Sequence, residues 1–364
     1  MKPRVAIVHE YLVDSGGAER VVIALHEQYP DAPIFTSVMD AQTTFADFRA
    51  MDVRTSFLQR LPVRKSNYKL LLPFFPLAFE SFDFSEYDIV ISSASAFAKG
   101  VITPSEALHI CYCYTPPRFA WRFHEYVAQE QMGRIRRVFI QFILHYLREW
   151  DYVAAQRVDF FVSVSQATAR RIRKNYRRDS VVIHPPVAVE SFAPSDDIGD
   201  YYLIVSRLAP YKRIDLAVQA FNELRLPLKI VGAGIDAARL QKIASQNIEF
   251  LGHVPQNRLA DLYARCRAVI FPGVEDFGIV PLEANAAGRP VIAYAAAGAL
   301  ETIVDGVTGT FFHEQTPTAL AQAVRATDVT RFDARALQQH AEQFSQTRFK
   351  ERIANFVEGK WRTR

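Results

Sequence analysis

Residues 273–290 read G-V-E-D-F-G-I-V-P-L-E-A-N-A-A-G-R-P, and this stretch is the most informative part of the chain. The run R-A-V-I-F-P before it is short and apolar, as in a buried strand, and the run L-E-A-N-A-A after it forms helix readily. Pro281 suits the first helical position, and Val280 stands where a capping Ser, Thr, Asp or Asn is expected. The stretch therefore predicts a strand, a glycine turn and a helix N-terminus that can bind an anion.

Two carboxylates, Glu275 and Glu283, flank the predicted turn and stand eight positions apart. Carboxylate oxygens accept hydrogen bonds from hydroxyl groups, so the pattern indicates a ligand with phosphate and hydroxyl groups. A plainer interpretation makes Glu283 a carboxylate of the first helical turn, where the helix dipole favours it. The two roles are compatible.

Length and composition indicate a globular protein of two domains. The chain has 364 residues, of which 49% are hydrophobic and 23% charged. The apolar start V-A-I-V is short, and no run reaches about 18 apolar residues, so we expect neither a signal peptide nor a membrane-spanning helix. Three cysteines fit a reducing cytosol, and Cys111 and Cys113 lack the second ligand pair of a zinc site.

Positive charge is unevenly placed, although the net charge is only +4. Basic residues cluster in R-R-I-R-K-N-Y-R-R, residues 170–178, and at Arg134, Arg136 and Arg137. The surrounding sequence matches no nucleic-acid module that we can identify. An anionic membrane surface or an acceptor diphosphate suits these clusters better, so we expect no nucleic-acid partner.

Apolar runs alternate with helical patterns through both halves of the chain, which predicts α/β domains with parallel strands. Residues 186–200 interrupt the alternation with prolines and acidic residues, as an interdomain linker does. The pattern therefore predicts two Rossmann-like domains that face a central cleft.

The E-x7-E spacing resembles the signature of the retaining GT-B glycosyltransferases, in particular glycosyltransferase family 4. V-S-R-L-A-P-Y-K-R-I-D, I-V-G-A-G and L-G-H-V-P are similar to that family in order and spacing. H-E-Y-L-V-D-S-G-G-A-E-R-V, D-I-V-I-S-S and C-Y-C-Y-T-P-P-R-F-A-W resemble its bacterial polysaccharide-building, mannosyltransferase-like branch. The resemblance implies an acceptor-binding domain over residues 1–185, a nucleotide-sugar domain over residues 201–345, and a C-terminal helix over residues 346–364 that packs back on the first domain.

By resemblance, Arg207 and Lys212 neutralise the charge of the leaving diphosphate, and Glu275 contacts the transferred sugar. Arginine can do so with a planar fork and lysine as a point charge; taken without the resemblance, both are also consistent with solvated loop cations. The other residues implied on the donor side are Gly16, Gly17, Gly232, Gly234, His253, Val254, Phe277, Gly278, Ile279, Val280 and Glu283. His253 and Val254 are expected to use backbone groups, and Glu283 to accept from the ribose. Gly16 and Gly17 are also consistent with a plain glycine turn.

Five residues are expected on the acceptor side: Lys99, Tyr114, Thr115, Arg118 and Trp121. The chain departs from the family here, because relatives often have His where this sequence has Ser95 and Tyr114. Tyrosine can donate a hydrogen bond but cannot act as a base at neutral pH. The sequence therefore does not predict a step assisted by histidine at this position. The departure is compatible with a different donor or acceptor.

Residues 63–79 and 133–150 join basic residues to aromatic and aliphatic ones. Both segments could lie in a bilayer interface, with cations on headgroups and apolar side chains inserted. The alternative is ordinary core packing of aromatic residues. We expect a cytoplasmic protein held peripherally on the inner face of the membrane.

The resemblance therefore implies a retaining, metal-independent hexosyltransferase without a cofactor. In the family, the leaving phosphate helps to deprotonate the acceptor hydroxyl during front-face substitution. Mannose from GDP-mannose is the first expectation, and the acceptor is lipid-linked or an oligosaccharide. A UDP-sugar enzyme of the same fold, a GT-B epimerase, and a non-catalytic protein that binds nucleotide-sugar or membrane remain alternatives.

Overall fold

In the computed structural model, which describes residues 3–61, 68–121 and 134–364, the chain divides into two compact units. The first unit contains Met1–Pro185 and Lys350–Arg364, and the second contains Pro186–Phe349. The expected linker over residues 186–200 thus belongs to the second unit. Residues 346–349, which we expected to join the first unit, also belong to the second.

The first unit is built on a seven-stranded parallel sheet with the strand order β3-β2-β1-β4-β5-β6-β7. Its strands are β1 (Val5–His9), β2 (Ile34–Thr36), β3 (Val53–Thr55), β4 (Ile89–Ala94), β5 (Leu108–Cys113), β6 (Phe160–Ser163) and β7 (Ser180–Val182). Every residue of β4 and β5 is buried, as expected for central strands covered on both faces. The β-branched and aromatic runs of the sequence therefore form the centre of this unit.

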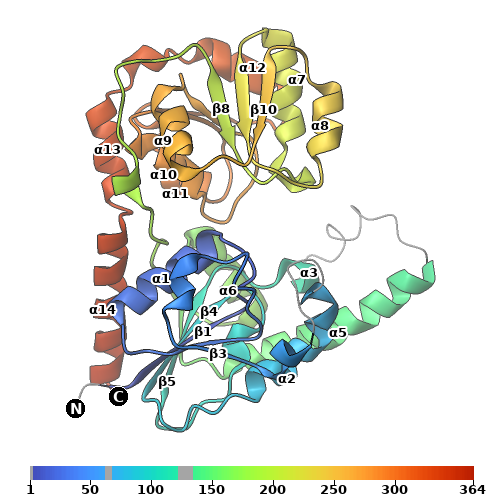
Figure 1. Ribbon diagram of the computed structural model, residues 1–364, viewed down its shortest axis with the longest axis vertical. Coiled ribbons are helices and arrows are strands. Elements are labelled where there is room, and N and C mark those ends of the chain that lie inside the picture. Colours follow the sequence, from blue (N-terminus) through green and yellow to red (C-terminus); the bar gives the residue numbers. More distant parts are fainter. Residues whose placement is uncertain (1–2, 62–67, 122–133) are drawn as a thin grey trace. The chain divides into compact units, whose positions relative to one another are not determined.

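Helices connect the strands of the first unit, and α5 extends beyond the rest of it (Figure 1). The helices are α1 (Gly17–Gln28), α2 (Phe75–Glu80), α3 (Arg118–Trp121), α5 (Arg134–Gln156) and α6 (Gln166–Tyr176). Short 3-10 helices cover Ala46–Arg49, Phe57–Arg60, Tyr68–Phe74 and Ala98–Gly100. Ser165 directly precedes α6, and its hydroxyl accepts from the Thr168 N–H and caps the helix.

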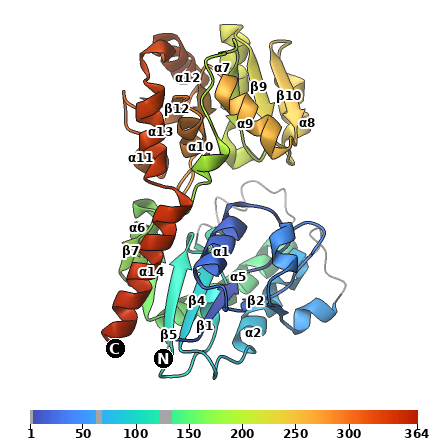
Figure 2. The same ribbon diagram turned by 60° about the vertical axis from the view of Figure 1, so that its left-hand side comes forward.

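The last helix, α14 (Gln346–Arg362), begins in the second unit, and its residues from Lys350 onward lie along the first unit (Figure 2). Phe356 of α14 and Phe160 of β6 meet edge to face, with their ring centroids 6.4 Å apart. The Lys360 ammonium lies 4.4 Å from the centroid of the Phe160 ring. Lys350 Nζ forms an ion pair of 2.8 Å with Glu27 of α1. The end of the chain is therefore a structural part of the first unit.

The second unit contains a six-stranded parallel sheet with the order β10-β9-β8-β11-β12-β13. Its strands are β8 (Tyr202–Val205), β9 (Leu228–Val231), β10 (Ile248–Gly252), β11 (Val269–Phe271), β12 (Val291–Tyr294) and β13 (Gly309–Phe312). In each sheet the first strand of the unit lies between the second and the fourth, in the orders β2-β1-β4 and β9-β8-β11. This is the Rossmann-like arrangement. The prediction of two parallel α/β sheets is thus confirmed.

Helices connect the strands of the second unit, and Arg289, shortly before β12, anchors the segment that enters the unit. The helices are α7 (Ile214–Leu224), α8 (Ala237–Ile243), α9 (Gln256–Arg265), α10 (Ile279–Ala286), α11 (Ala299–Thr302), α12 (Pro317–Ala326) and α13 (Ala334–Glu342), with 3-10 turns at Val189–Ser191, Pro210–Lys212 and Val329–Arg331. The buried Arg289 donates to the carbonyl oxygens of Ala264 and Ser195. This arginine therefore fixes the entering segment to the domain.

Candidate functional site

Charged and glycine-rich loops follow the strands of the second unit at one edge of its sheet. Since the strands are parallel, their carboxyl ends share that edge, which is where ligands bind in open α/β sheets. The loop after β8 carries Arg207 and Lys212, and the loop after β11 carries Glu275. The three residues that the sequence places in the reaction thus come from two neighbouring strands.

Lys212 and Glu275 form a direct ion pair at this edge. Nζ of Lys212 lies 2.5 Å from Oε1 of Glu275, and the side chains are 14% and 23% exposed. Partial exposure leaves the pair within reach of a ligand, in contrast to a buried structural ion pair. The backbone N–H of Gly298, in the loop after β12, donates to the Glu275 carbonyl at 3.0 Å and supports the loop from the other side.

Tyr211, which is not among the predicted site residues, contacts both Arg207 and Lys212. The Arg207 guanidinium donates to the Tyr211 hydroxyl at 2.7 Å and lies 5.8 Å from the ring centroid. The Lys212 ammonium lies 5.4 Å from the same centroid. The tyrosine therefore keeps the two cations on one side of the loop. Its signal in the sequence was an aromatic residue between two basic ones in R-L-A-P-Y-K.

Gly232 and Gly234 are required by the packing of the loop that carries Arg207. Gly232 has φ of +127°, and a Cβ on it would lie 1.9 Å from the Ser206 carbonyl oxygen. A Cβ on Gly234 would lie 2.1 Å from the carbonyl oxygen of Leu208. The sequence predicted that these glycines let the backbone approach a nucleotide. In the structure they let two loops approach each other, and their contact with a nucleotide stays a prediction.

Helix α10 begins two residues earlier than the sequence suggested. Its N-cap is Gly278, in the left-handed region with φ of +91°, and Ile279 is the first helical residue. Pro281 is thus the third helical residue, and the expectation that it begins the helix is wrong. No side chain caps the helix, so the N–H groups of Ile279 and Val280 can bind an anion. Phe277, just before the cap, is buried.

Glu283 is buried in α10, where its Oε2 accepts from the hydroxyl of Tyr263 at 2.8 Å. Because the helix begins at Ile279, Glu283 lies beyond the first turn, and the interpretation as a first-turn carboxylate is wrong. Tyr263 is fully buried in α9 and fixes the orientation of the carboxylate. Tyr263 is not among the predicted site residues, because nothing near it in the sequence marks a contact with Glu283.

His253 and Val254 follow β10 and differ in environment. His253 is exposed, whereas the Val254 side chain packs into the core of the second unit. The carbonyl of Gly252 accepts from the Gly232 N–H at 2.7 Å, which ties this loop to the one after β9. The Val254 side chain is thus occupied by core packing, and a contact of its backbone groups with a nucleotide stays a prediction.

In the first unit, Gly16 caps α1 and Gly17 is the first helical residue. The N–H of Gly16 donates to Oε2 of Glu19 at 3.0 Å, so the carboxylate closes the turn from within the helix. Behind this turn, the Tyr114 hydroxyl donates to the Ala18 carbonyl at 3.0 Å. The turn is therefore fixed on two sides.

Glu10, directly after β1, accepts hydrogen bonds from backbone N–H groups at the end of β4. Its buried carboxylate accepts from the N–H groups of residues 95–98 at 2.7–3.2 Å. Four backbone donors satisfy one carboxylate, as an anion-binding nest does. The Ser95 backbone, at the position where relatives often have His, is thus held by the chain itself.

Lys99 is not a free acceptor-side group, so this prediction is wrong, whereas Trp121 is partly buried and stays a predicted acceptor-side residue. Lys99 is 1% exposed, and its ammonium binds Asp151 and the Ala96 carbonyl. Asp151 Oδ2 also accepts from Trp121 Nε1 at 2.7 Å and from the Tyr176 hydroxyl at 2.9 Å. A buried cation needs such a partner, and the partner removes Lys99 from contact with any ligand.

Thr115 and Arg118 are half-buried at the end of β5 and the start of α3. The Thr115 hydroxyl accepts from Arg171 of α6 at 3.2 Å. Both residues remain predicted acceptor-side groups.

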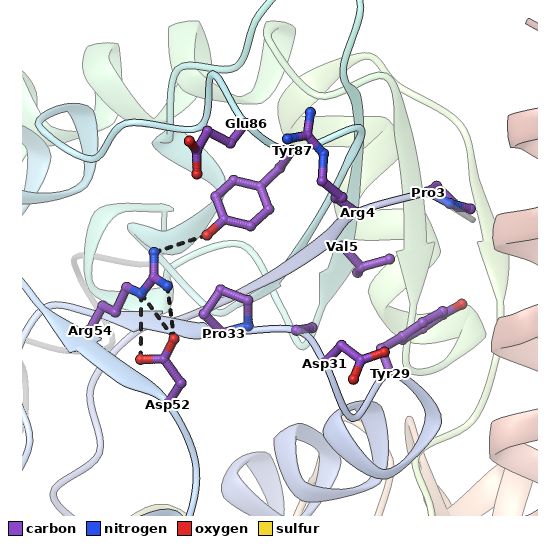
Figure 3. A pocket seen from close by; sticks show the side chains of 11 residues that line it. Pro3, Arg4, Val5, Tyr29, Asp31, Pro33, Asp52, Arg54, Glu86 and Tyr87 are labelled. Atoms are coloured by element: carbon purple, nitrogen blue, oxygen red, sulfur yellow. Dashed lines mark hydrogen bonds and ion pairs between the residues drawn. The ribbon is translucent and has the colours of Figure 1, made fainter. Parts of the chain in front are cut away.

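A hollow of about 330 Å³ lies elsewhere in the first unit, where β1, β2 and β3 begin (Figure 3). Arg54 on its wall is already paired with Asp52 at 2.8 Å and donates to the Tyr87 hydroxyl at 2.9 Å. The hollow is thus at the amino ends of the strands, whereas the predicted site residues follow their carboxyl ends. It is not the candidate site.

The segments predicted at a bilayer interface are partly core and partly surface. Phe75, Phe79, Leu144 and Leu147 are buried, whereas the exposed set consists of Leu70, Phe74, Leu77, Phe142 and Tyr146, which we call the apolar surface. Leu70 is 78% exposed and Phe142 is 73% exposed. Residues 63–67 and the side chains of Arg134, Arg136 and Arg137 lie outside the described part of the chain. Within the described part, no helix is long and apolar enough to cross a bilayer.

Two family models match the chain. Glycosyltransferase Family 4 matches residues 15–191, and Glycosyl transferases group 1 matches residues 188–327. Among curated relatives, a GDP-mannose-dependent alpha-(1-6)-phosphatidylinositol monomannoside mannosyltransferase of Mycolicibacterium smegmatis is 32% identical over 46% of this chain and 52% of that protein. A D-inositol 3-phosphate glycosyltransferase of Frankia alni is 33% identical over 39% of this chain and 43% of that protein. The chain thus spans about half the length of these relatives.

A third relative matches more of the chain at lower identity. The human alpha-1,3/1,6-mannosyltransferase ALG2 is 27% identical over 89% of this chain and 86% of that protein. Among solved structures, Anabaena HepE in complex with UDP and glucose has a TM-score of 0.71 at 18% identity, covering 98% of this chain and 99% of that one. The sucrose-phosphate synthase of Thermosynechococcus elongatus has a TM-score of 0.74 at 16% identity, covering 99% and 100%. These structures share the predicted fold.

Proposed function

The chain belongs to glycosyltransferase family 4, with the GT-B fold, and from this premise we propose that it is a retaining hexosyltransferase. It moves mannose from GDP-mannose onto a lipid-linked or oligosaccharide acceptor in bacterial surface polysaccharide synthesis. The observation that carries the proposal is the Lys212–Glu275 ion pair beside Arg207 at the carboxyl edge of the second sheet. Mannose is favoured because two relatives are named as mannosyltransferases, one of them GDP-mannose-dependent.

The nucleotide-sugar binds in the second unit. Arg207 and Lys212 bind the diphosphate, whose negative charge also suits the uncapped N-terminus of α10. Glu275 accepts hydrogen bonds from hydroxyls of the transferred sugar. Glu283, oriented by Tyr263, accepts from a ribose hydroxyl.

The transfer makes one bond and breaks one bond on the same face of the sugar. The acceptor oxygen bonds to the anomeric carbon while the bond between that carbon and the phosphate oxygen breaks, with its electron pair going to the phosphate. The proton of the acceptor hydroxyl passes to an oxygen of the departing diphosphate. Arg207 and Lys212 stabilise the charge that develops there, and such stabilisation is the largest catalytic contribution in many enzymes. This route needs neither a metal nor a cofactor.

A donor screen tests the proposal. The purified full chain is incubated with GDP- and UDP-sugars, with and without EDTA, and release of nucleoside diphosphate is measured. We expect the largest release from GDP-mannose and no effect of EDTA. Release only from UDP-sugars would establish the UDP-sugar alternative, and loss of activity in EDTA would contradict metal independence.

A pair of carboxylate variants separates an enzyme from a non-catalytic binding protein. Glu275→Ala should abolish transfer while nucleotide binding persists. Glu249→Ala removes an exposed carboxylate that is paired with Lys229 on the neighbouring strand of the same unit, and it should leave transfer unchanged. Binding of GDP by the wild type without turnover of any donor would favour the binding protein.

We also propose that the apolar surface of the first unit docks on an anionic membrane at the inner face of the cell membrane. Exposed aromatic and aliphatic side chains suit insertion at the interface, and the exposed cations Arg170, Arg173 and Lys174 of α6 suit anionic headgroups. Lipid docking would give the enzyme access to a lipid-linked acceptor.

Vesicle binding tests the docking. We expect sedimentation with phosphatidylglycerol-containing vesicles that weakens as salt rises. The double variant Phe74→Ser and Phe142→Ser should bind at least about a hundredfold more weakly, because each change removes roughly 1.5–3 kcal/mol of apolar burial and about 1.4 kcal/mol is tenfold. Val181→Ser, which alters an exposed residue of β7, is the control. Equal binding at low and high salt would contradict the proposal.

A further inference from the structure

Four polar side chains meet where β1, β4 and β5 end and α1 begins. Nδ1 of His9 lies 3.0 Å from the Ser93 hydroxyl, which lies 2.8 Å from the Tyr114 hydroxyl. The Tyr114 hydroxyl lies 3.0 Å from the carbonyl oxygen of Ala18. Nε2 of His9 lies 3.9 Å from Oε1 of Glu19. His9, Ser93 and Glu19 are buried, and Tyr114 is partly buried at the end of this series of contacts.

The donor and the acceptor of each hydrogen bond in this series follow from the Ala18 carbonyl, at which the series ends. The Ala18 carbonyl can only accept, so Tyr114 donates its single proton there. Ser93 must then donate to the Tyr114 oxygen, which leaves His9 to donate from Nδ1 to Ser93. Tyr114 therefore has no proton left for a ligand. Burial raises the pKa of Tyr114 well above its ordinary value, so the hydroxyl stays neutral.

The same contacts fix the turn at Gly16 and Gly17 from two sides. Tyr114 binds the carbonyl of Ala18, and Glu19 binds the N–H of Gly16 and lies within ion-pair distance of His9. Hydrogen bonds donated in turn by His9, Ser93 and Tyr114 thus connect the ends of β1, β4 and β5 to the turn.

We propose that Tyr114 is a positioning residue that holds the Gly16–Gly17 turn, and that it does not contact the transferred sugar. His9, Ser93 and Glu19 complete this device. The turn presents the N–H groups of the first turn of α1 to a phosphate or sugar oxygen. The identity of that ligand rests on the proposed function, whereas the positioning of the turn does not.

Amide hydrogen exchange tests the positioning directly. In Tyr114→Phe, the peptide covering residues 14–20 should exchange at least about tenfold faster than in the wild type, because its tether to β5 is lost. Tyr112→Phe is the matched control: it removes a buried tyrosine hydroxyl from the same chain segment, but one that donates to the Ile183 carbonyl at 3.0 Å. This control should accelerate exchange near residue 183 and not at residues 14–20. Unchanged exchange at residues 14–20 in Tyr114→Phe would overturn the proposal.

Two further measurements use active and isotope-labelled protein. Tyr114→Phe should lower kcat at least about tenfold while the Kd for guanosine, which lacks the phosphates that the turn would bind, changes less than twofold, because the nucleoside contact proposed for Glu283 lies in the second unit. In protein labelled with ¹⁵N-histidine, Nδ1 of His9 should carry a proton, and an unprotonated Nδ1 would overturn the assigned bond directions. If no donor is turned over, the exchange and labelling results still decide the positioning role, so the two proposals fail separately.

Discussion

The two units use their charged residues in opposite ways. At the carboxyl edge of the second sheet, Lys212 and Glu275 are partly exposed and Arg207 is exposed. At the corresponding edge of the first sheet, Lys99 and Glu10 are buried and satisfied by the chain itself. The difference shows that a charged residue after a strand marks a ligand site only if its partner leaves it accessible.

The largest expected effect is on the stability of the first unit. Lys99→Met removes the cation from a buried pair and leaves Asp151 uncompensated, so the free energy of unfolding should fall by about 3–5 kcal/mol. Denaturant unfolding of the full chain measures this loss. A change below about 1 kcal/mol would mean that the pair is solvated, and it would erase the distinction between the units.

Lys212→Met is the corresponding change in the second unit and should act on rate. Loss of one charge that stabilises the leaving diphosphate should lower kcat by about 10²–10³. The free energy of unfolding should change by less than about 1 kcal/mol, since the pair is partly exposed. A large loss of stability with normal turnover would make Lys212 a structural residue like Lys99.

A smaller effect concerns acid stability, again in the first unit. Burial, with a further contribution from the charge of Arg157, lowers the pKa of His109 from 6.5 to about 3. Between these values the unfolded chain binds the proton and the folded chain does not. Stability is therefore complete above about pH 6.5 and falls toward pH 3, by at most about 1.4 kcal/mol per pH unit.

Substitution of the histidine tests this pH dependence. His109→Gln should flatten the fall between pH 6.5 and 4 in acid unfolding. The change keeps a polar group beside Ser92, whose hydroxyl lies 2.8 Å from Nε2. His253→Gln, at an exposed histidine of the second unit, should leave the curve unchanged. An unaltered slope in His109→Gln would assign the acid sensitivity to other groups.

The sequence predicted most of the fold, because the periodic apolar runs became strands and the stretch around Glu275 became a strand, turn and helix. It also predicted the two neighbouring loops that bring Lys212 and Glu275 together, since parallel strands share a carboxyl edge. It failed for Lys99, because the decisive partner, Asp151, is 52 residues away and nothing local indicates their contact. It also misplaced the start of α10, because the left-handed turn at Gly278 begins the helix before Pro281.

The assignment of Lys350–Arg364 to the first unit has a consequence for biosynthesis. A ribosome makes the whole second unit before it makes the helix that completes the first. At about 5–20 residues per second, the surface around Phe160 waits on the order of ten to forty seconds for its covering helix. The second unit is continuous in sequence and can finish folding during that interval. The unit that begins the chain is thus the last to be completed.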